Sequence, residues 1–188
     1  VTAENAGLKK IASSLTADKK HDLTAMLKAI DADTRLIYIC NPNNPTGTLC
    51  ASEALLNFIN EATKRTKVLV DEAYLDYTDQ PSLANLVTEN KNLIIARTFS
   101  KIYGLAGARI GYALAHPETI TEMSELDFST SGSVSILSAS GALASLKDNK
   151  FDAETISLNA EARKYTIEQL EKLKIPCIQS HTNFVYFS

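Results

Sequence analysis

The chain has 188 residues, of which 45% are hydrophobic and 22% charged, and its formal net charge is −3 at pH 7. This composition predicts a folded protein of one domain, or one domain and part of a second, and excludes a disordered chain. The balance of 19 basic and 22 acidic residues gives no electrostatic basis for binding nucleic acid or an anionic membrane. No apolar run approaches the roughly 20 residues that span a bilayer.

The cysteines and histidines predict neither disulfides nor a metal site. Three cysteines without CxxC spacing are typical of free thiols in a reducing compartment. Because no signal-peptide pattern is present either, we expect a cytoplasmic protein. The histidines are scattered, so no metal ligand set is predicted. These residues are Cys40, Cys50 and Cys177, and His21, His116 and His181.

Helical and strand patterns alternate from the start of the chain. Asp22 can cap a helix with apolar positions up to Ile30. The apolar run at 35–40 predicts a buried strand, and the sequence NPNNPTG at 41–47 predicts a turn-rich loop. We expect a helix capped by Ser52 to follow, ending near Thr63. Its predicted inward positions are Leu55, Leu56, Ile59 and Ala62.

Three further apolar runs, at 67–70, 92–97 and 110–115, predict strands. Strands that are apolar on both faces and alternate with helices are typical of an α/β fold with a mostly parallel sheet. The sequence therefore predicts a sheet covered by helices, built from at least the first 148 residues.

The last forty residues show a different pattern. Residues 152–174 predict one long amphipathic helix, and residues 175–178 and 183–187 predict two short strands. We expect residues 1–148 to form part of a large domain and residues 149–188 to begin a smaller one. The apolar positions on one face of the long helix are Ile156, Ala160, Ile167 and Leu170.

Polar clusters follow three consecutive predicted strands. They are NPTG at 44–47, DEAY at 71–74 and TFSK at 98–101. Ligands of open α/β sheets bind outside the carboxyl ends of the strands. Lys101 is either a solvated surface lysine or, if partly desolvated, a nucleophile with a lowered pKa that reacts with aldehydes.

The other polar residues fit a site for pyridoxal phosphate, although each also has a purely structural interpretation. Arg109 can clamp a phosphate, with hydroxyls nearby as further donors, or form a surface salt bridge. Asp71 can pair with a protonated pyridine nitrogen or cap the next segment. Asn44 and Tyr74 can donate to the phenolic oxygen, or serve as a turn residue and a packed aromatic. The nearby hydroxyls belong to Thr98 and Ser100.

The segments 41–47, 71–74 and 100–111 resemble, in order and approximate spacing, the signatures of class I/II (fold type I) pyridoxal phosphate aminotransferases. Histidinol-phosphate aminotransferases are the most similar subgroup. The resemblance implies a three-layer α/β/α large domain with a mostly parallel sheet, plus part of a smaller α+β C-terminal domain. It also implies a homodimer, and an amino acid or amine-type donor with a 2-oxo acid acceptor, of the histidinol-phosphate/2-oxoglutarate type.

The resemblance also implies a role for each residue that matches a motif. Lys101 would attach the cofactor covalently and later move the substrate proton in a ping-pong transamination. Asp71 would pair with the pyridine nitrogen, while Asn44 and Tyr74 would bond the ring oxygen. The phosphate would be held by Thr98, Ser100 and Arg109.

Family members are about twice as long, so the resemblance implies a partial chain. The arginine that binds the substrate carboxylate is expected outside these residues, and Asn183 is only a candidate neighbour of the substrate. A serine-rich loop at 127–135 replaces the proline-containing loop of many relatives.

Four alternatives stay open at this point. Two keep the fold: an aromatic or other amino acid aminotransferase, and a threonine-phosphate decarboxylase. A third is a sensor domain of a transcription regulator. The fourth is an isolated chain that folds poorly and binds nothing.

Overall fold

A computed structural model describes residues 2–5, 7–125 and 134–187. Most of the predicted serine-rich loop at 127–135 lies outside the described residues. The helices and strands are α1 (Thr2–Asn5), α2 (Leu23–Lys28), β1 (Leu36–Cys40), α3 (Ser52–Ala62), β2 (Lys67–Asp71), η1 (Leu75–Tyr77), η2 (Leu83–Leu86), β3 (Leu93–Thr98), η3 (Ala106–Ala108), β4 (Gly111–Ala115), α4 (Pro117–Glu125), α5 (Ile136–Ser145) and α6 (Asn149–Lys172).

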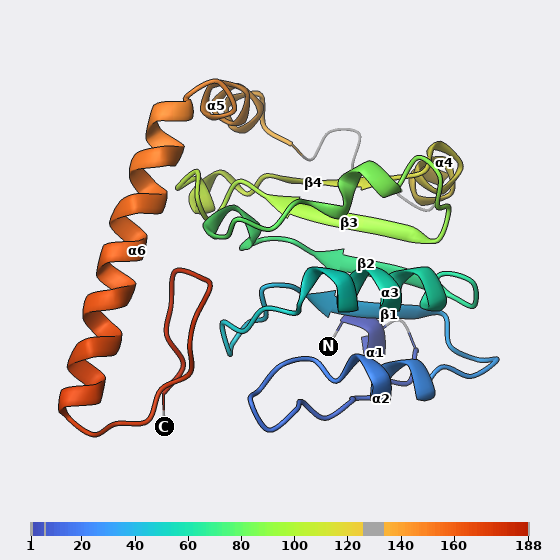
Figure 1. Cartoon of the computed structure of the whole chain (residues 1–188). Helices are drawn as coiled ribbons and strands as arrows, with labels where there is room; N and C mark the ends of the chain where they lie inside the picture. Colours follow the sequence, from blue (N-terminus) through green and yellow to red (C-terminus); the bar gives the residue numbers. More distant parts are fainter. Residues whose placement is uncertain (1, 6, 126–133, 188) are drawn as a thin grey trace.

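The four strands form one sheet in the order β1-β2-β3-β4 (Figure 1). The first three strands are parallel, and β4 runs antiparallel to β3. The predicted α/β fold with a mostly parallel sheet is therefore confirmed. Since β1, β2 and β3 are parallel, their carboxyl ends share one edge of the sheet, which faces α6 and the C-terminal loop (Figure 1).

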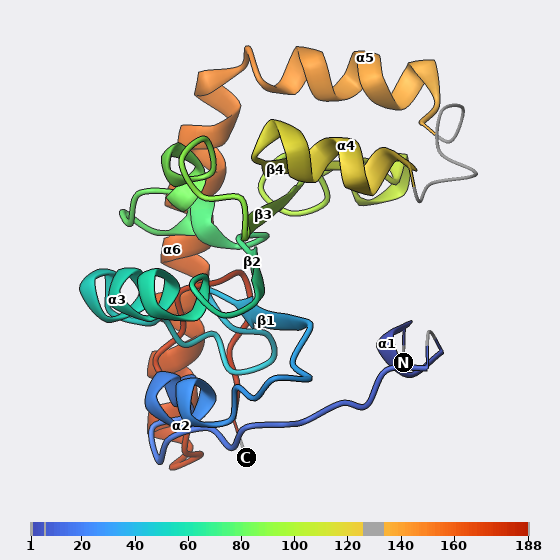
Figure 2. The ribbon, with the colours of Figure 1, turned by 90° about the vertical axis from the view of Figure 1, so that its right-hand side faces the viewer.

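The main core lies between one face of the sheet and the helices α2 and α3, which Figure 2 shows on the same side. Alternate strand residues point to this face because side chains alternate along a strand. Burying each large aliphatic side chain stabilises the fold by about 1.5–3 kcal/mol. The core strand residues are Ile37, Ile39, Val68, Val70, Leu93 and Ile95.

The opposite face is less covered. Tyr38 is 54% exposed, so the prediction of burial on both faces is wrong for β1 within the described structure. Leu36, on the same strand, is also exposed. Figure 2 shows α1 on this side, well away from the strands.

The caps of α2 and α3 differ in how well the sequence predicted them. Asp22 caps α2 as predicted, and its Oδ1 accepts from the Ala25 N–H at 2.8 Å. The cap prediction for Ser52 is wrong, because Ala51 occupies the N-cap and no side chain bonds there. Leu56 is exposed and Phe58 is buried in its place, since the helical period groups position 58, and not 56, with Leu55.

The long C-terminal helix was predicted correctly, and its predicted apolar face only in part, since Ile167 and Leu170 are half-buried. The side chains of Asn159 and Arg163 both donate to the carbonyl of Thr182, at 3.2 and 2.8 Å. By contrast, Ile156 and Ala160 are exposed. The helix packs on a loop whose backbone carbonyl accepts hydrogen bonds, so polar side chains of the helix make this contact.

The two short strands predicted after α6 are wrong. Pairing is limited to an isolated bridge between Cys177 and Phe187, with a hydrogen bond from the Ile178 N–H to the Tyr186 carbonyl at 2.9 Å. The division into domains at residues 148 and 149 stays a prediction. Within the described ranges, no helix combines the length and apolarity needed to cross a bilayer.

Candidate active site

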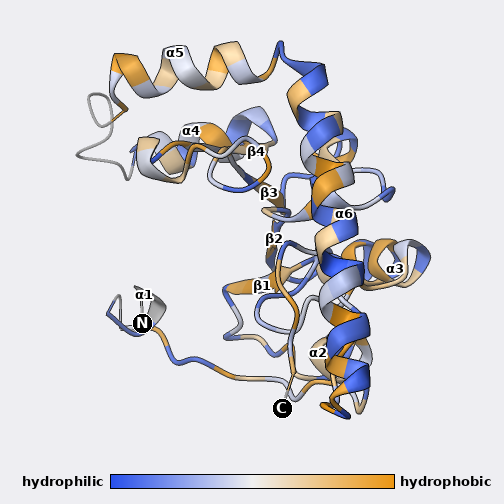
Figure 3. Cartoon of the chain, turned by 90° about the vertical axis from the view of Figure 1, so that its left-hand side faces the viewer, coloured by the Kyte–Doolittle hydropathy of each residue, from blue (hydrophilic) through white to orange (hydrophobic). Residues whose placement is uncertain are grey.

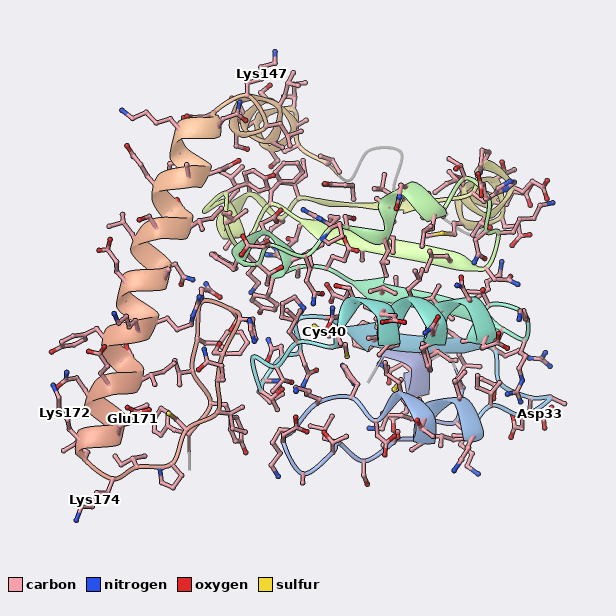
Figure 4. The ribbon with its side chains drawn as sticks, in the orientation of Figure 1. Asp33, Cys40, Lys147, Glu171, Lys172 and Lys174 are labelled. Atoms are coloured by element: carbon pink, nitrogen blue, oxygen red, sulfur yellow. The ribbon has the colours of Figure 1, made fainter. Side chains whose placement is uncertain are left out.

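The loops after β1, β2 and β3 surround a cavity of about 580 Å³ at the carboxyl edge of the sheet. Figure 4 labels Cys40, which ends β1 at this edge. All seven residues predicted for the site line the cavity: Asn44, Asp71, Tyr74, Thr98, Ser100, Lys101 and Arg109. Six other residues contribute to the lining: Tyr38, Cys40, Ala73, Ala96, Arg97 and Ala106.

The loop after β1 is held by its own asparagines. The Asn41 side chain accepts from the Cys50 N–H at 2.9 Å, and the Asn43 side chain donates to Thr46 at 2.8 Å. These internal bonds leave Asn44 exposed on the cavity side. Its Nδ2 donates to the Tyr74 hydroxyl at 3.0 Å. The Asn44 amide of this loop and the Tyr74 phenol of the segment after β2 can thus bond one ligand oxygen together.

Asp71 ends β2, in register with Cys40 of β1 and Ala96 of β3. Its Oδ1 accepts from the Ala73 N–H at 3.0 Å, and its Oδ2 accepts from the Tyr38 hydroxyl at 2.8 Å. A carboxylate has about four acceptor positions. Both oxygens therefore keep capacity for a cationic group in the cavity.

Lys101 lies beside Tyr74. The Nζ atom is 4.9 Å from the centroid of the Tyr74 ring, within the range of a cation–π contact. Tyr74 is buried, and the Phe184 ring packs edge-on against it with 5.2 Å between centroids. The lysine amine thus has a fixed aromatic neighbour and faces the same cavity as Asp71.

Two hydroxyls and a guanidinium form the third part of the lining. The Ser100 N–H donates to Thr98 Oγ1 at 3.1 Å. Arg109 has a left-handed backbone with φ of 52° and donates to the Ala106 carbonyl at 2.8 Å. Because a guanidinium carries five N–H donors, most of its donors stay available. This cluster can bind an anion such as a phosphate.

Sequence reasoning missed Arg97, which is largely buried next to the predicted residues. Its side chain is 14% exposed and pairs with Glu72 at 3.0 Å and Asp76 at 2.5 Å. Burial lowers the pKa of Arg97, but the two carboxylates outweigh this effect and raise it overall. Glu72 also accepts from the Ser82 hydroxyl at 2.6 Å. Arg97 therefore ties β3 to the segment that carries Asp71 and Tyr74.

Tyr38 and Cys40 were also missed as site residues. Burial, together with the neighbouring Asp71, raises the pKa of the Cys40 thiol, so the thiol stays neutral and is a poor nucleophile. Both residues lie in an apolar run that predicts only a strand. The register that aligns Cys40 with Asp71 was the missing signal.

Asn183 is exposed and is absent from the cavity lining within the described structure. Neighbouring residues of the same loop contact the segments that line the cavity. The His181 N–H donates to the Gly47 carbonyl at 2.8 Å, and Phe184 packs on Tyr74. Among the described residues, no group of three or more His, Cys, Asp or Glu side chains could hold a metal ion.

Fold and cavity together define a class of α/β protein that binds its ligand at the carboxyl ends of parallel strands. The model of the aminotransferase class I and II family matches residues 1–188. The chain belongs to this family.

The chain is similar to particular members of this family. The histidinol-phosphate aminotransferase of Moorella thermoacetica is 39% identical over 175 residues, covering 91% of this chain. This chain spans 45% of that protein, less than half its length.

The chain is also similar to solved structures. The structure of histidinol-phosphate aminotransferase from Sinorhizobium meliloti in complex with pyridoxal-5'-phosphate has a TM-score of 0.90 and 30% identity, over 97% of this chain and 50% of the other. The L-threonine-O-3-phosphate decarboxylase of Porphyromonas gingivalis is less similar. Its TM-score is 0.71 with 26% identity, over 82% of this chain and 48% of the other.

Proposed function

We propose that the protein containing this chain is a pyridoxal phosphate-dependent aminotransferase that moves an amino group from an amino acid or amine donor to a 2-oxo acid. One observation carries the proposal. A carboxylate, a lysine amine, a paired amide and phenol, and an anion-binding cluster all line one cavity. These are the complementary groups for the ring nitrogen, aldehyde, ring oxygen and phosphate of this cofactor.

Each part of the lining fits one part of pyridoxal phosphate. The Arg109 donors, with the Thr98 and Ser100 hydroxyls, would hold the phosphate, since charge-assisted bonds to phosphate are strong. Asp71 would face the ring nitrogen. The amide of Asn44 and the phenol of Tyr74, which lie 3.0 Å apart, would bond the ring oxygen. Lys101 would hold the cofactor covalently through Nζ.

When bound, pyridoxal phosphate supplies an electron sink for the bonds of the carbon that carries the amino group. The protein's part is to bind, orient and move protons. Lys101 Nζ would take the proton from the donor carbon that carries the amino group. The negative charge of Asp71 favours a protonated ring nitrogen. The centroid of the Tyr74 ring lies 4.9 Å from Lys101 Nζ, and this contact would help to hold the amine in place.

Similarity to histidinol-phosphate aminotransferases supports histidinol phosphate as donor. The resemblance of the motifs makes 2-oxoglutarate our proposed acceptor. The lower similarity to a threonine-phosphate decarboxylase makes decarboxylation the second candidate. Assays of the complete protein with histidinol phosphate, aromatic amino acids and threonine phosphate separate the two, because only the second reaction releases carbon dioxide. Turnover of none of these, with a bound ligand that alters DNA binding, would favour the sensor domain.

A homodimer and a cytoplasmic location are further parts of the proposal. The family resemblance supports the dimer. The three free cysteines support a reducing compartment.

The first test is the absorption spectrum of the complete protein with pyridoxal phosphate, recorded beside a Lys101→Ala variant. We expect a visible band in the wild type that is lost in the variant, because only a covalent bond through Nζ gives the shifted band. A Lys164→Ala variant on the exposed side of α6 is the control and should keep the band. A folded wild type without the band would contradict the proposal.

A further inference from the structure

Tyr38 reaches Asp71 across the sheet. In the parallel register, Cys40 of β1 is aligned with Asp71 of β2, and Tyr38 is aligned with Leu69. Residues two apart on a strand share a face, so Tyr38 lies on the face of the sheet that carries Asp71. The tyrosine side chain is long enough to span the diagonal, and its hydroxyl donates to Asp71 Oδ2 at 2.8 Å.

The two donors to Asp71 bond different oxygens of its carboxylate. The Ala73 N–H bonds Oδ1 and the Tyr38 hydroxyl bonds Oδ2. One donor on each oxygen fixes the plane of the carboxylate, which a single donor would leave free to turn. Both donors are neutral, so neither forms an ion pair with Asp71 in place of a cationic ligand group. No such constraint was visible in the sequence.

The surroundings of Tyr38 favour the protonated form of its hydroxyl. Burial, and then the bond to Asp71, raise the pKa of Tyr38 above its usual value. The tyrosine therefore acts as a donor at neutral and alkaline pH. Tyr38 is 54% exposed, so packing holds it less tightly than a core residue, and the hydrogen bond to Asp71 fixes its hydroxyl.

We propose that Tyr38 is a positioning residue that orients the Asp71 carboxylate toward the ring nitrogen of the cofactor. Tyr38 lines the same cavity as Asp71 and Lys101, but it acts on the cofactor through Asp71. The inference rests on the proposed function, since it requires a ligand with a protonated ring nitrogen. It adds a residue that the sequence motifs leave out.

The test is the affinity of the complete protein for pyridoxal phosphate after Tyr38→Phe, which removes only the hydroxyl. We expect the dissociation constant to rise roughly three- to tenfold, as for the loss of one hydrogen bond to a charged group in a partly exposed site. Because the ring is retained, the variant should still fold, and its melting temperature without cofactor should fall only slightly. Tyr165→Phe, on an exposed α6 tyrosine, is the matched control and should bind as the wild type does.

Two comparisons separate orientation of Asp71 from a general effect on the cavity. A cofactor analogue with carbon in place of the ring nitrogen should bind wild type and Tyr38→Phe equally. In an Asp71→Ala background, Tyr38→Phe should cause no further loss of affinity, because the two residues act as one unit. Equal weakening of both cofactors would assign Tyr38 to cavity packing and overturn the proposal.

Failure of this inference is distinguishable from failure of the proposed function. If Tyr38→Phe binds pyridoxal phosphate as tightly as the wild type, while Lys101→Ala loses the visible band, the role of Tyr38 is refuted and the enzyme class stands. If the wild type shows no band at all, both are overturned.

Discussion

At the scale of single residues, the buried charges around Arg97 are a strong determinant of stability near the site. Removing one member of a buried ion pair leaves the others uncompensated in a medium of low polarity. Arg97 faces two carboxylates, those of Glu72 and Asp76. Removing Arg97 would therefore destabilise the fold mainly because it leaves these two carboxylates without a cation, even if the intact network adds little net stability.

We expect Arg97→Met to lower the free energy of unfolding by about 3–5 kcal/mol, measured by urea denaturation. Lys67→Met is the matched control, because it breaks the 3.0 Å pair of Lys67 with Glu122 in a more exposed setting. That change should cost no more than about 1 kcal/mol. Similar losses in the two variants would show that the Arg97 network is no more than a surface contact.

At the scale of elements, the loop after β1 and the C-terminal loop interlock at Gly47. Gly47 has a φ of +72°, and a Cβ added there would lie 2.4 Å from Ser180 Oγ. Ser180 and Thr182 are both buried, and their hydroxyls are 2.9 Å apart. The C-terminal loop thus fixes the segment that carries Asn44, so the position of Asn44 depends on residues far along the chain.

Gly47→Ala should therefore combine two costs. The positive φ alone costs about 1–2 kcal/mol, and the clash with Ser180 adds about 1–3 kcal/mol. Gly7→Ala is the control, because Gly7 has a φ of +75° with nothing within 4 Å of the added Cβ. Unfolding free energies of the two variants measure the difference, and affinity for pyridoxal phosphate should fall for Gly47→Ala only. Equal losses for both variants would mean that the loops do not constrain each other.

Much of this arrangement could be predicted from the sequence, for reasons that particular elements make clear. Apolar runs identified β1, β2 and β3, and polar clusters at their ends identified six of the seven predicted lining residues, because parallel strands bring their ends together. The seventh, Arg109, was identified from its position eight residues after Lys101. Tyr38 was missed because an aromatic in an apolar run is indistinguishable from a core residue. Arg97 was missed because the penultimate residue of a strand gives no sign of its partners.

Strand pairing and helix contact faces after β3 depend on tertiary structure, which the periodicity of the sequence does not encode. β4 pairs antiparallel with β3, and no pattern in its own sequence indicates this direction. The segments at 175–178 and 183–187 have strand-like composition but meet only at one bridge. The polar contact face of α6 is selected by the carbonyl of Thr182, and no hydrophobic pattern marks it.

At the scale of the whole molecule, apolar surface remains open within the described structure. Ile136 and Leu137 of α5 are 78% and 81% exposed, and Figure 3 shows hydrophobic colours on this helix. Leu36 of β1 and Arg109 of the anion-binding cluster are exposed as well. An apolar helix and an open sheet face are typical of surfaces that another part of a protein covers.

We therefore expect the isolated 188-residue chain to show little or no transaminase activity, even though it carries Lys101 and Asp71. Water reaches Arg109 from the open side, and screening by water weakens a charge-assisted bond to phosphate. The measurement compares turnover and cofactor affinity of the isolated chain with those of the complete protein. Lys101→Ala in both proteins gives the background rate. Turnover by the isolated chain at the rate of the complete protein would show that these residues alone form a working site, and that the exposed surfaces need no covering.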